Sequence, residues 1–316
     1  MFSTTTIELL LVAACRQPSV RDLAFLLSAP SPWTSGCDID PARLLGAQGE
    51  QRLRELDARP QPLLDWLAQH QPLRRLGRYA ELLLTFWFQF APHIQLVSAN
   101  LAVRDAKSHT VGEFDFLLRL DGEPWHLEVA SKFYLQQPQT DAEWVGPGLQ
   151  DAWPLKAAKL AQQLVLSRHP AATALLPPGF AGCRAGLRLT GWRFTSGQPV
   201  SQPAGWVASV SGAWPCRPAG ARWVLLPRLA WLSPARVSEE YTLAESDLRT
   251  RLALTAGPQL VAALQPDGTG AWCEVTRGFV TPSDWPDAER LAALCQRIQA
   301  LPASTAAPAA AIFHPG

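Results

Sequence analysis

The sequence predicts an α/β fold: a mixed β-sheet flanked by helices, with a helical N-terminal extension and a β-containing C-terminal extension. Two strand-like runs at 112–120 and 126–134 are joined by turn residues at 121–124, which predicts a β-hairpin. Apolar helical patterns precede and follow this hairpin, and a further strand is expected near 185–194. A sheet with helices on both faces is the arrangement that this order favours.

We expect four segments along the chain of 316 residues. Residues 1–70 are expected to form the helical extension, because apolar residues recur there at helical spacing. The prolines at 30 and 32 and at 60 and 62 mark breaks between these helices. Residues 71–195 are expected to hold the sheet core with its two helices, and 196–300 the C-terminal extension. Residues 301–316 are rich in Ala and Pro, which predicts a disordered tail.

The C-terminal extension is expected to open with a loop at 196–222, where Gly, Pro and Ser are frequent. Apolar runs predict strands at 223–226, 259–264 and 272–280, and a short helix follows at 287–300.

Composition limits the function classes. The formal net charge is only +1, so any nucleic-acid binding must come from local basic patches. The six cysteines are scattered without a CxxC pair, and the six histidines show no ligand spacing, which argues against a zinc site or a disulfide framework. Neither a GxxxxGK phosphate loop nor a GxSxG motif occurs.

The N-terminal run at 9–15 superficially matches a lipoprotein cleavage site, but it lacks a basic region before it and is too short for a usual signal. No apolar run reaches the ~18–20 residues that a membrane span needs. We therefore expect a soluble, cytoplasmic protein with no membrane partner.

Charged residues interrupt the apolar pattern of the hairpin. Side chains alternate between faces along a strand, so Glu113 and Asp115 share one face of the first strand, and Glu128 and Lys132 share one face of the second. Pairing the strands would bring Asp115, Glu128 and Lys132 onto one patch. Two carboxylates and a lysine can hold a divalent cation and position a water; the alternative is that they form the solvated face of a half-buried hairpin.

Lysine usage also singles out this region. The chain has only four lysines, although Lys and Arg together number 28. Three of the four, Lys132, Lys156 and Lys159, lie in or after the hairpin. Lysine is a compact charge whose pKa can be tuned, whereas arginine stays charged.

Glu81 lies in a helical run that is almost wholly apolar after it. A buried glutamate is costly unless it is paired or binds metal. Arg74, Arg75 and Arg78 precede it and are expected either to contact a nucleic-acid backbone or to pair with Glu81 and its neighbours.

A second helix is predicted from Asp151 to about Arg168. Lys156, Lys159 and Gln163 recur at three- and four-residue spacing, so they share one face. That face is expected to contact phosphate or to be an ordinary solvated helix face.

Together these residues resemble the core of the PD-(D/E)XK superfamily of restriction-endonuclease-like nucleases, over about 71–195. More narrowly, the chain resembles a bacterial family described only as domain of unknown function 1853. The narrower resemblance is carried by residues 20–24, 77–81, 112–116, 127–135, 279–280 and 285–286.

The superfamily resemblance implies hydrolysis of phosphodiester bonds in DNA with Mg²⁺ (or Mn²⁺). It implies that Asp115 and Glu128 bind the metal, that Glu81 completes the site, and that Lys132 orients water and stabilises charge on the phosphate. Glu113 is a second candidate ligand.

The resemblance further implies substrate contacts from Lys156, Lys159, Gln163 and Arg78. One departure matters: the superfamily places its lysine two residues after the acid, where this chain has Ala130, and Lys132 lies about 6.6 Å further along an extended strand. The alternative function is therefore a catalytically inactive nuclease-fold module that binds nucleic acid or protein.

Six of the 13 tryptophans lie in the C-terminal extension, and four of these six are expected either to stack on bases or to pack in the core: Trp206, Trp214, Trp223 and Trp231.

Overall fold

The computed structural model describes residues 10–138, 140–196, 203–215, 219–302 and 313–315. The strands are β1 Trp33–Ser35, β2 Ile94–Arg104, β3 Thr110–Leu120, β4 Glu123–Gln136, β5 Trp144–Val145, β6 Arg184–Ser196, β7 Ala204–Ser209, β8 Arg222–Leu225, β9 Arg236–Ser238, β10 Gln259–Pro266, β11 Ala271–Thr281 and β12 Phe313–Pro315. The helices are α2 Pro18–Ser28, α3 Pro41–Leu45, α4 Gly49–Ala58, α5 Gln61–Ala68, α6 Leu76–Phe90, α7 Trp153–Leu164, α8 Pro170–Thr173, α9 Glu245–Leu252 and α10 Ala288–Gln299, with short 3₁₀ turns η1 Leu166–Arg168, η2 Arg228–Ala230 and η3 Glu239–Tyr241.

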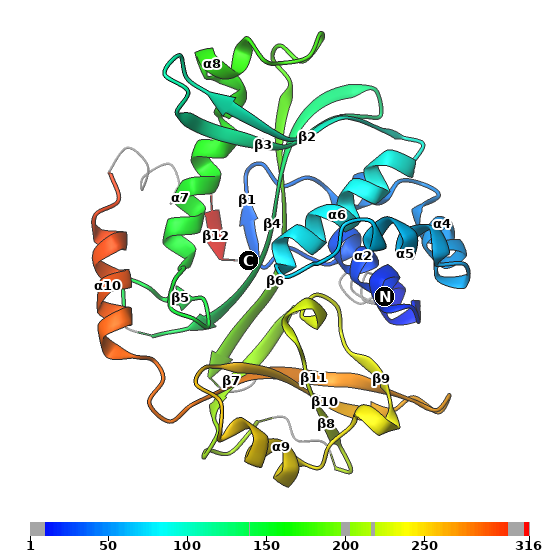
Figure 1. Ribbon diagram of the computed structural model, residues 1–316, viewed down its shortest axis with the longest axis vertical. Helices are drawn as coiled ribbons and strands as arrows, with labels where there is room; N and C mark the ends of the chain where they lie inside the picture. The colour runs from blue at the N-terminus through cyan, green and yellow to red at the C-terminus, as the bar shows by residue number, and fades with distance from the viewer. Residues whose placement is uncertain (1–9, 139, 197–202, 216–218, 303–312, 316) are drawn as a thin grey trace.

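Among the described residues, ten strands form one mixed sheet whose main order is β2-β3-β4-β6-β7-β11-β10-β8 (Figure 1). Strands β2, β3 and β4 are antiparallel, and α7 then crosses over so that β6 lies parallel to β4. Strands β6, β7 and β11 are parallel neighbours, and β10 and β8 return antiparallel. The predicted mixed sheet flanked by helices is confirmed.

Helices cover both faces of the sheet where β4 and β6 run. Figure 1 shows α6 and α2 on one side of these strands and α7 on the other. The α6 side buries Leu82 and Leu83 against Phe116 and Leu118 of β3 in one apolar core. The α7 side forms a second core, in which Trp153 stacks on Trp33 with ring centroids 4.2 Å apart.

The elements predicted around the site are present. The hairpin pairs Phe116 with Leu127, and the strand expected at 185–194 lies within β6. The helix expected from Asp151 to Arg168 ends earlier, at Leu164, and continues as η1. The strands and the helix predicted after residue 222 correspond to β8, β10, β11 and α10.

One expectation in the C-terminal part is wrong. The loop expected at 196–222 contains β7, which pairs with β6 and β11, so the sheet continues across residue 196. The disordered tail expected at 301–316 stays a prediction, because most of it lies outside the described residues; within it, residues 313–315 form β12 against β1. Both are short strands that depend on distant partners; residues 197–202, 216–218 and 303–312 lie outside the described part.

Buried polar contacts join the N-terminal helices to the C-terminal part. Asp22 on α2 accepts hydrogen bonds from the Tyr79 hydroxyl at 3.0 Å and the Ser233 hydroxyl at 2.6 Å. Burial raises the pKa of Asp22, which these two donors partly offset. Arg188 on β6, 3% exposed, donates to the carbonyls of Leu26 and Ala29 at the end of α2, where a cation complements the helix dipole.

Gly191 lies opposite Lys132 in the β4–β6 pair and has a φ of +125°. A Cβ there would collide with the backbone carbonyl of Lys132. Only glycine suits both the conformation and the close approach, so Gly191 sets how β6 passes the part of β4 that carries Lys132.

The four tryptophans named above pack in the interior. Trp206, Trp214 and Trp223 contact one another within a single core cluster. Trp231 is also buried and packs edge-on against Phe279. The core-packing alternative holds for all four. In the described part of the chain, no helix is both long and apolar enough to cross a membrane.

Candidate functional site

Strands β3 and β4 part at the position of the two predicted acids. Their ladder pairs Leu120 with Glu123 and extends as far as Phe116 with Leu127. Beyond that point, side chains replace the backbone ladder: the Val129 N–H donates to Asp115 Oδ2 at 2.9 Å, and the Asp115 N–H donates to Glu128 Oε1 at 3.4 Å. Asp115 and Glu128 therefore lie together at the fork between the strands.

Glu128 is completely buried and has one strong partner. His126 Nε2, also without exposed surface, lies 2.6 Å from Glu128 Oε1. The His126 ring packs edge-on against Phe114, with ring centroids 4.5 Å apart. Glu128 Oε2 is buried and has no hydrogen-bond partner among the described residues. Such an oxygen costs free energy unless a water or a cation satisfies it.

The surroundings of Asp115 raise the pKa of its carboxyl group. Burial raises its pKa to about 7, and the adjacent Glu128 and the more distant Glu81 act in the same direction. The Val129 N–H and the Lys156 ammonium lower the pKa of Asp115 but do not compensate. Two neighbouring carboxylates that are shielded from water hold their negative charges poorly.

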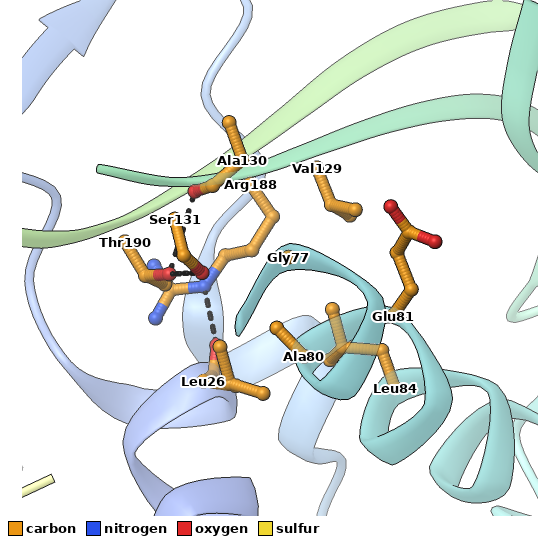
Figure 2. A pocket seen from close by; sticks show the side chains of 10 residues that line it. All are labelled: Leu26, Gly77, Ala80, Glu81, Leu84, Val129, Ala130, Ser131, Arg188 and Thr190. Carbon is orange, nitrogen blue, oxygen red and sulfur yellow. Dashed lines mark hydrogen bonds between the residues drawn. The ribbon is translucent and has the colours of Figure 1, made fainter. Parts of the chain in front are cut away.

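Glu81 reaches the same region from α6. Figure 2 shows its carboxylate pointing from the helix toward β4, close to Val129. Arg78, one turn earlier, donates to Glu81 at 3.4 Å. Burial raises the pKa of Glu81, which Arg78 and Lys156 lower and Glu113 raises. Glu81 is thus half-buried and paired, and its charge is felt by Asp115.

A small cavity lies beside Glu81. It measures about 40 Å³ and is also lined by Ser131 and Thr190, whose hydroxyl oxygens are 2.8 Å apart (Figure 2). This space suits one or two waters and is too small for a nucleotide.

The two central lysines have different surroundings. Lys132 Nζ contacts Asp151, which also accepts a hydrogen bond from the Tyr134 hydroxyl at 2.8 Å. Lys156 on α7 is the lysine whose charge reaches the acids. Burial, together with the charge of Lys132, lowers the pKa of Lys156 to about 8, although Asp115 and Glu128 act to raise it.

The remaining predicted residues lie around this cluster. Glu113 is exposed on β3 and acts on Glu81 through its charge. Arg78 is exposed and paired with Glu81. Lys159 is exposed on α7, and Gln163 is half-buried with its Oε1 unpartnered among the described residues. The structure therefore gathers Glu81, Asp115, Glu128 and Lys156.

The donor atoms of the cluster limit which residues could hold a metal. Within the described ranges, no group of three or more His, Cys, Asp or Glu side chains is arranged as a ready metal site. The residues that fit a hard cation are Asp115 and Glu128, because their charges act on each other at the fork and Glu128 Oε2 lacks a partner among the described residues. Glu81, which is paired with Arg78, adds a third negative charge that acts on Asp115, and the Lys156 ammonium acts in the opposite direction.

A polar groove of about 690 Å³ adjoins the cluster. Its described lining includes Glu81, Lys132, Asp151 and Lys156, but neither Asp115 nor Glu128. The acid pair therefore does not line the groove, whereas Glu81 and Lys156, whose charges act on Asp115, do.

Sequence reasoning missed His126 and Asp151. His126 lies two residues before Glu128, so the period of the strand already placed both on one face. Asp151 gave no such signal, because it meets Lys132 only through the fold of the 146–152 loop.

The chain matches one family model over most of its length. The family model described as Domain of unknown function (DUF1853) matches residues 21–281. The chain belongs to this family. The narrower of the two resemblances is thus confirmed, and the match runs from α2 through β11, so the DUF1853 unit includes the acid cluster and most of the C-terminal part. No curated protein and no solved structure matches the chain.

The raised pKa of Asp115 predicts a pH-dependent stability. The folded state binds this proton up to about pH 7, whereas the unfolded chain releases it near pH 4. The unfolding free energy should therefore fall as pH rises from about 4 to 7, by on the order of 2–4 kcal/mol from this group. Urea unfolding across this range should show that the Asp115→Asn variant lacks this fall.

Glu113→Gln, on the same strand but exposed, is the matched control and should keep the pH dependence of the wild type. Equal pH slopes for wild type and Asp115→Asn would contradict the assignment.

The His126–Glu128 contact predicts a coupled effect on stability. His126→Ala leaves the buried Glu128 carboxylate with only the long hydrogen bond from the Asp115 N–H, and it should cost about 3–5 kcal/mol of unfolding free energy. Adding Glu128→Gln should recover part of this loss, because the second change removes the unpaired charge. Chemical denaturation of His126→Ala and of the His126→Ala/Glu128→Gln double variant measures both changes in unfolding free energy.

His109→Ala provides the comparison, since His109 is 75% exposed and pairs with Asp105 at the surface. It should cost less than about 1 kcal/mol. A loss of unfolding free energy in His126→Ala no larger than that in His109→Ala would contradict the coupling of His126 to Glu128. A larger loss in the His126→Ala/Glu128→Gln double variant than in His126→Ala alone would also contradict it.

Proposed function

We propose that this DUF1853 protein is a Mg²⁺-dependent phosphodiesterase that hydrolyses DNA, built on a restriction-endonuclease-like core. The observation that carries the proposal is the Asp115–Glu128 pair at the β3–β4 fork, with Glu81 and Lys156 within electrostatic reach. Helix α6 carries Glu81, β3 Asp115 and β4 Glu128, in the order that the superfamily resemblance implies.

The donor set supports a hard divalent cation. Asp115 and Glu128 would hold it, and the resemblance assigns Glu81, whose charge acts on Asp115, to completing the site. A bound Mg²⁺ would acidify water and offset the charge that develops on a phosphoryl oxygen. Its positive charge would also offset the repulsion between the two carboxylates and their repulsion of a phosphodiester.

Lys156 is the better candidate for the role that the resemblance gives to Lys132. Its ammonium acts on Asp115 and Glu128, whereas Lys132 is paired with Asp151, which also accepts a hydrogen bond from the Tyr134 hydroxyl. With a pKa of about 8, Lys156 is mainly protonated at pH 7 and supplies a point charge facing the groove. This accounts for Ala130 at the position where the superfamily has its lysine.

The second candidate function is a catalytically inactive nuclease-fold module that binds nucleic acid or protein. The complete burial of Glu128 and the engagement of Lys132 with Asp151 favour it. It shares the groove and the acid pair with the leading proposal and differs only in turnover.

A cleavage assay separates the two functions. Single-stranded, duplex and branched DNA are incubated with the protein and Mg²⁺ or Mn²⁺. Cleavage should fall at least about 100-fold in Asp115→Asn and in Lys156→Ala, by analogy with the loss of one charge-stabilising donor. Lys132→Ala should lose less than Lys156→Ala.

Lys107→Ala, in an exposed turn, serves as the control and should cleave like the wild type. Absence of metal-dependent cleavage on all three substrates would favour the inactive module, and full activity in Asp115→Asn would remove the acid pair from the mechanism.

A further inference from the structure

The groove beside the acid cluster carries an excess of positive charge. Besides Lys132 and Lys156, its lining includes Arg74, Arg75 and Arg228, against only two acids, Glu81 and Asp151. This excess is local, because the whole chain has a formal net charge of only +1. A concentration of cations in one concave surface attracts a polyanion.

Three of these cations are available to a ligand. Lys132 is neutralised by Asp151. Arg74, Arg75 and Arg228 are exposed, and none of them forms a salt bridge with a carboxylate in the described ranges. Exposed arginines without acidic partners, grouped in one groove, suit a ligand that brings its own negative charges.

The arginines come from distant parts of the chain that the fold brings together. Arg74 and Arg75 precede α6, and Arg228 begins η2, which packs against α6. The η2 turn is well anchored: the Trp231 indole N–H donates to the Leu226 carbonyl at 3.0 Å, and Arg228 lies over the Trp231 ring at 5.4 Å. The C-terminal part thus contributes a fixed cation to the groove.

We propose that this groove binds a nucleic-acid strand through its phosphates, with Arg74, Arg75 and Arg228 as backbone contacts that lead the strand to Glu81 and Lys156. The destination of the strand rests on the proposed function, but its binding does not. Arginine contacts to successive phosphates fix the register of a strand without reading its sequence. Arg228, in the C-terminal part, is a binding residue that the superfamily resemblance does not supply.

Salt-dependent binding tests the proposal. Fluorescence anisotropy is measured with a labelled 20-nucleotide DNA strand and with the corresponding duplex, in EDTA so that no cleavage occurs. Removing one arginine that binds a phosphate should reduce the slope of log K against log salt by about 0.7–0.9. Arg228→Ala should therefore lower the slope by about one such unit, and Arg74→Ala/Arg75→Ala by up to about two, and the affinity should fall several-fold for each arginine removed.

Two further variants make the test specific. Arg228→Lys keeps the charge and should retain most of the salt slope. Arg251→Ala removes one exposed arginine from α9, outside the groove, and should bind like the wild type. Unchanged slopes in the groove variants, an equal loss in Arg251→Ala, or no binding of either DNA at low salt would each overturn the proposal.

The failure of this inference is distinguishable from that of the proposed function. If DNA binding depends on the three arginines but no cleavage occurs, the binding role of the groove is retained and the hydrolytic function is rejected. If cleavage depends on Asp115 but not on the arginines, the hydrolytic site is retained and the binding role of the groove is rejected.

Discussion

The burial of two carboxylates side by side is the constraint on which the rest of this structure depends. At the β3–β4 fork the Val129 N–H donates to Asp115 and the Asp115 N–H donates to Glu128, which has no exposed surface. Such a pair is destabilising unless protons, donors or a cation offset its charge. His126 and Lys156 supply part of this compensation, and Glu81 adds to the negative charge. The remaining imbalance is what a divalent cation would satisfy.

The surrounding fold holds this unfavourable arrangement in place. Helices α6 and α7 pack on opposite faces of β4, so Glu81 and Lys156 approach the fork from two sides. The sheet continues without a break into the C-terminal part, and Asp22 links α2, α6 and Ser233 through buried hydrogen bonds. The family match spans both parts, and the C-terminal part contributes Arg228, on η2, to the groove.

The hairpin and its two acids could be predicted from the sequence, because strand periodicity and a short turn determine which side chains share a face. The distinction between Lys132 and Lys156 could not. Period alone put Lys132 with Glu128, but its contact with Asp151 depends on how the 146–152 loop returns to β4. Strand β7 was missed for a related reason: its six residues form a strand through pairing with β6 and β11, and local composition there favours a loop.

A crystal structure of the protein with Mn²⁺, using the anomalous signal of the ion, tests the central claim most directly. The account predicts a single strong peak bound by Asp115 and Glu128, with Glu81 nearby, and its loss in crystals of the Asp115→Asn variant. Well-ordered crystals that contain Mn²⁺ but show no peak at the β3–β4 fork would contradict it.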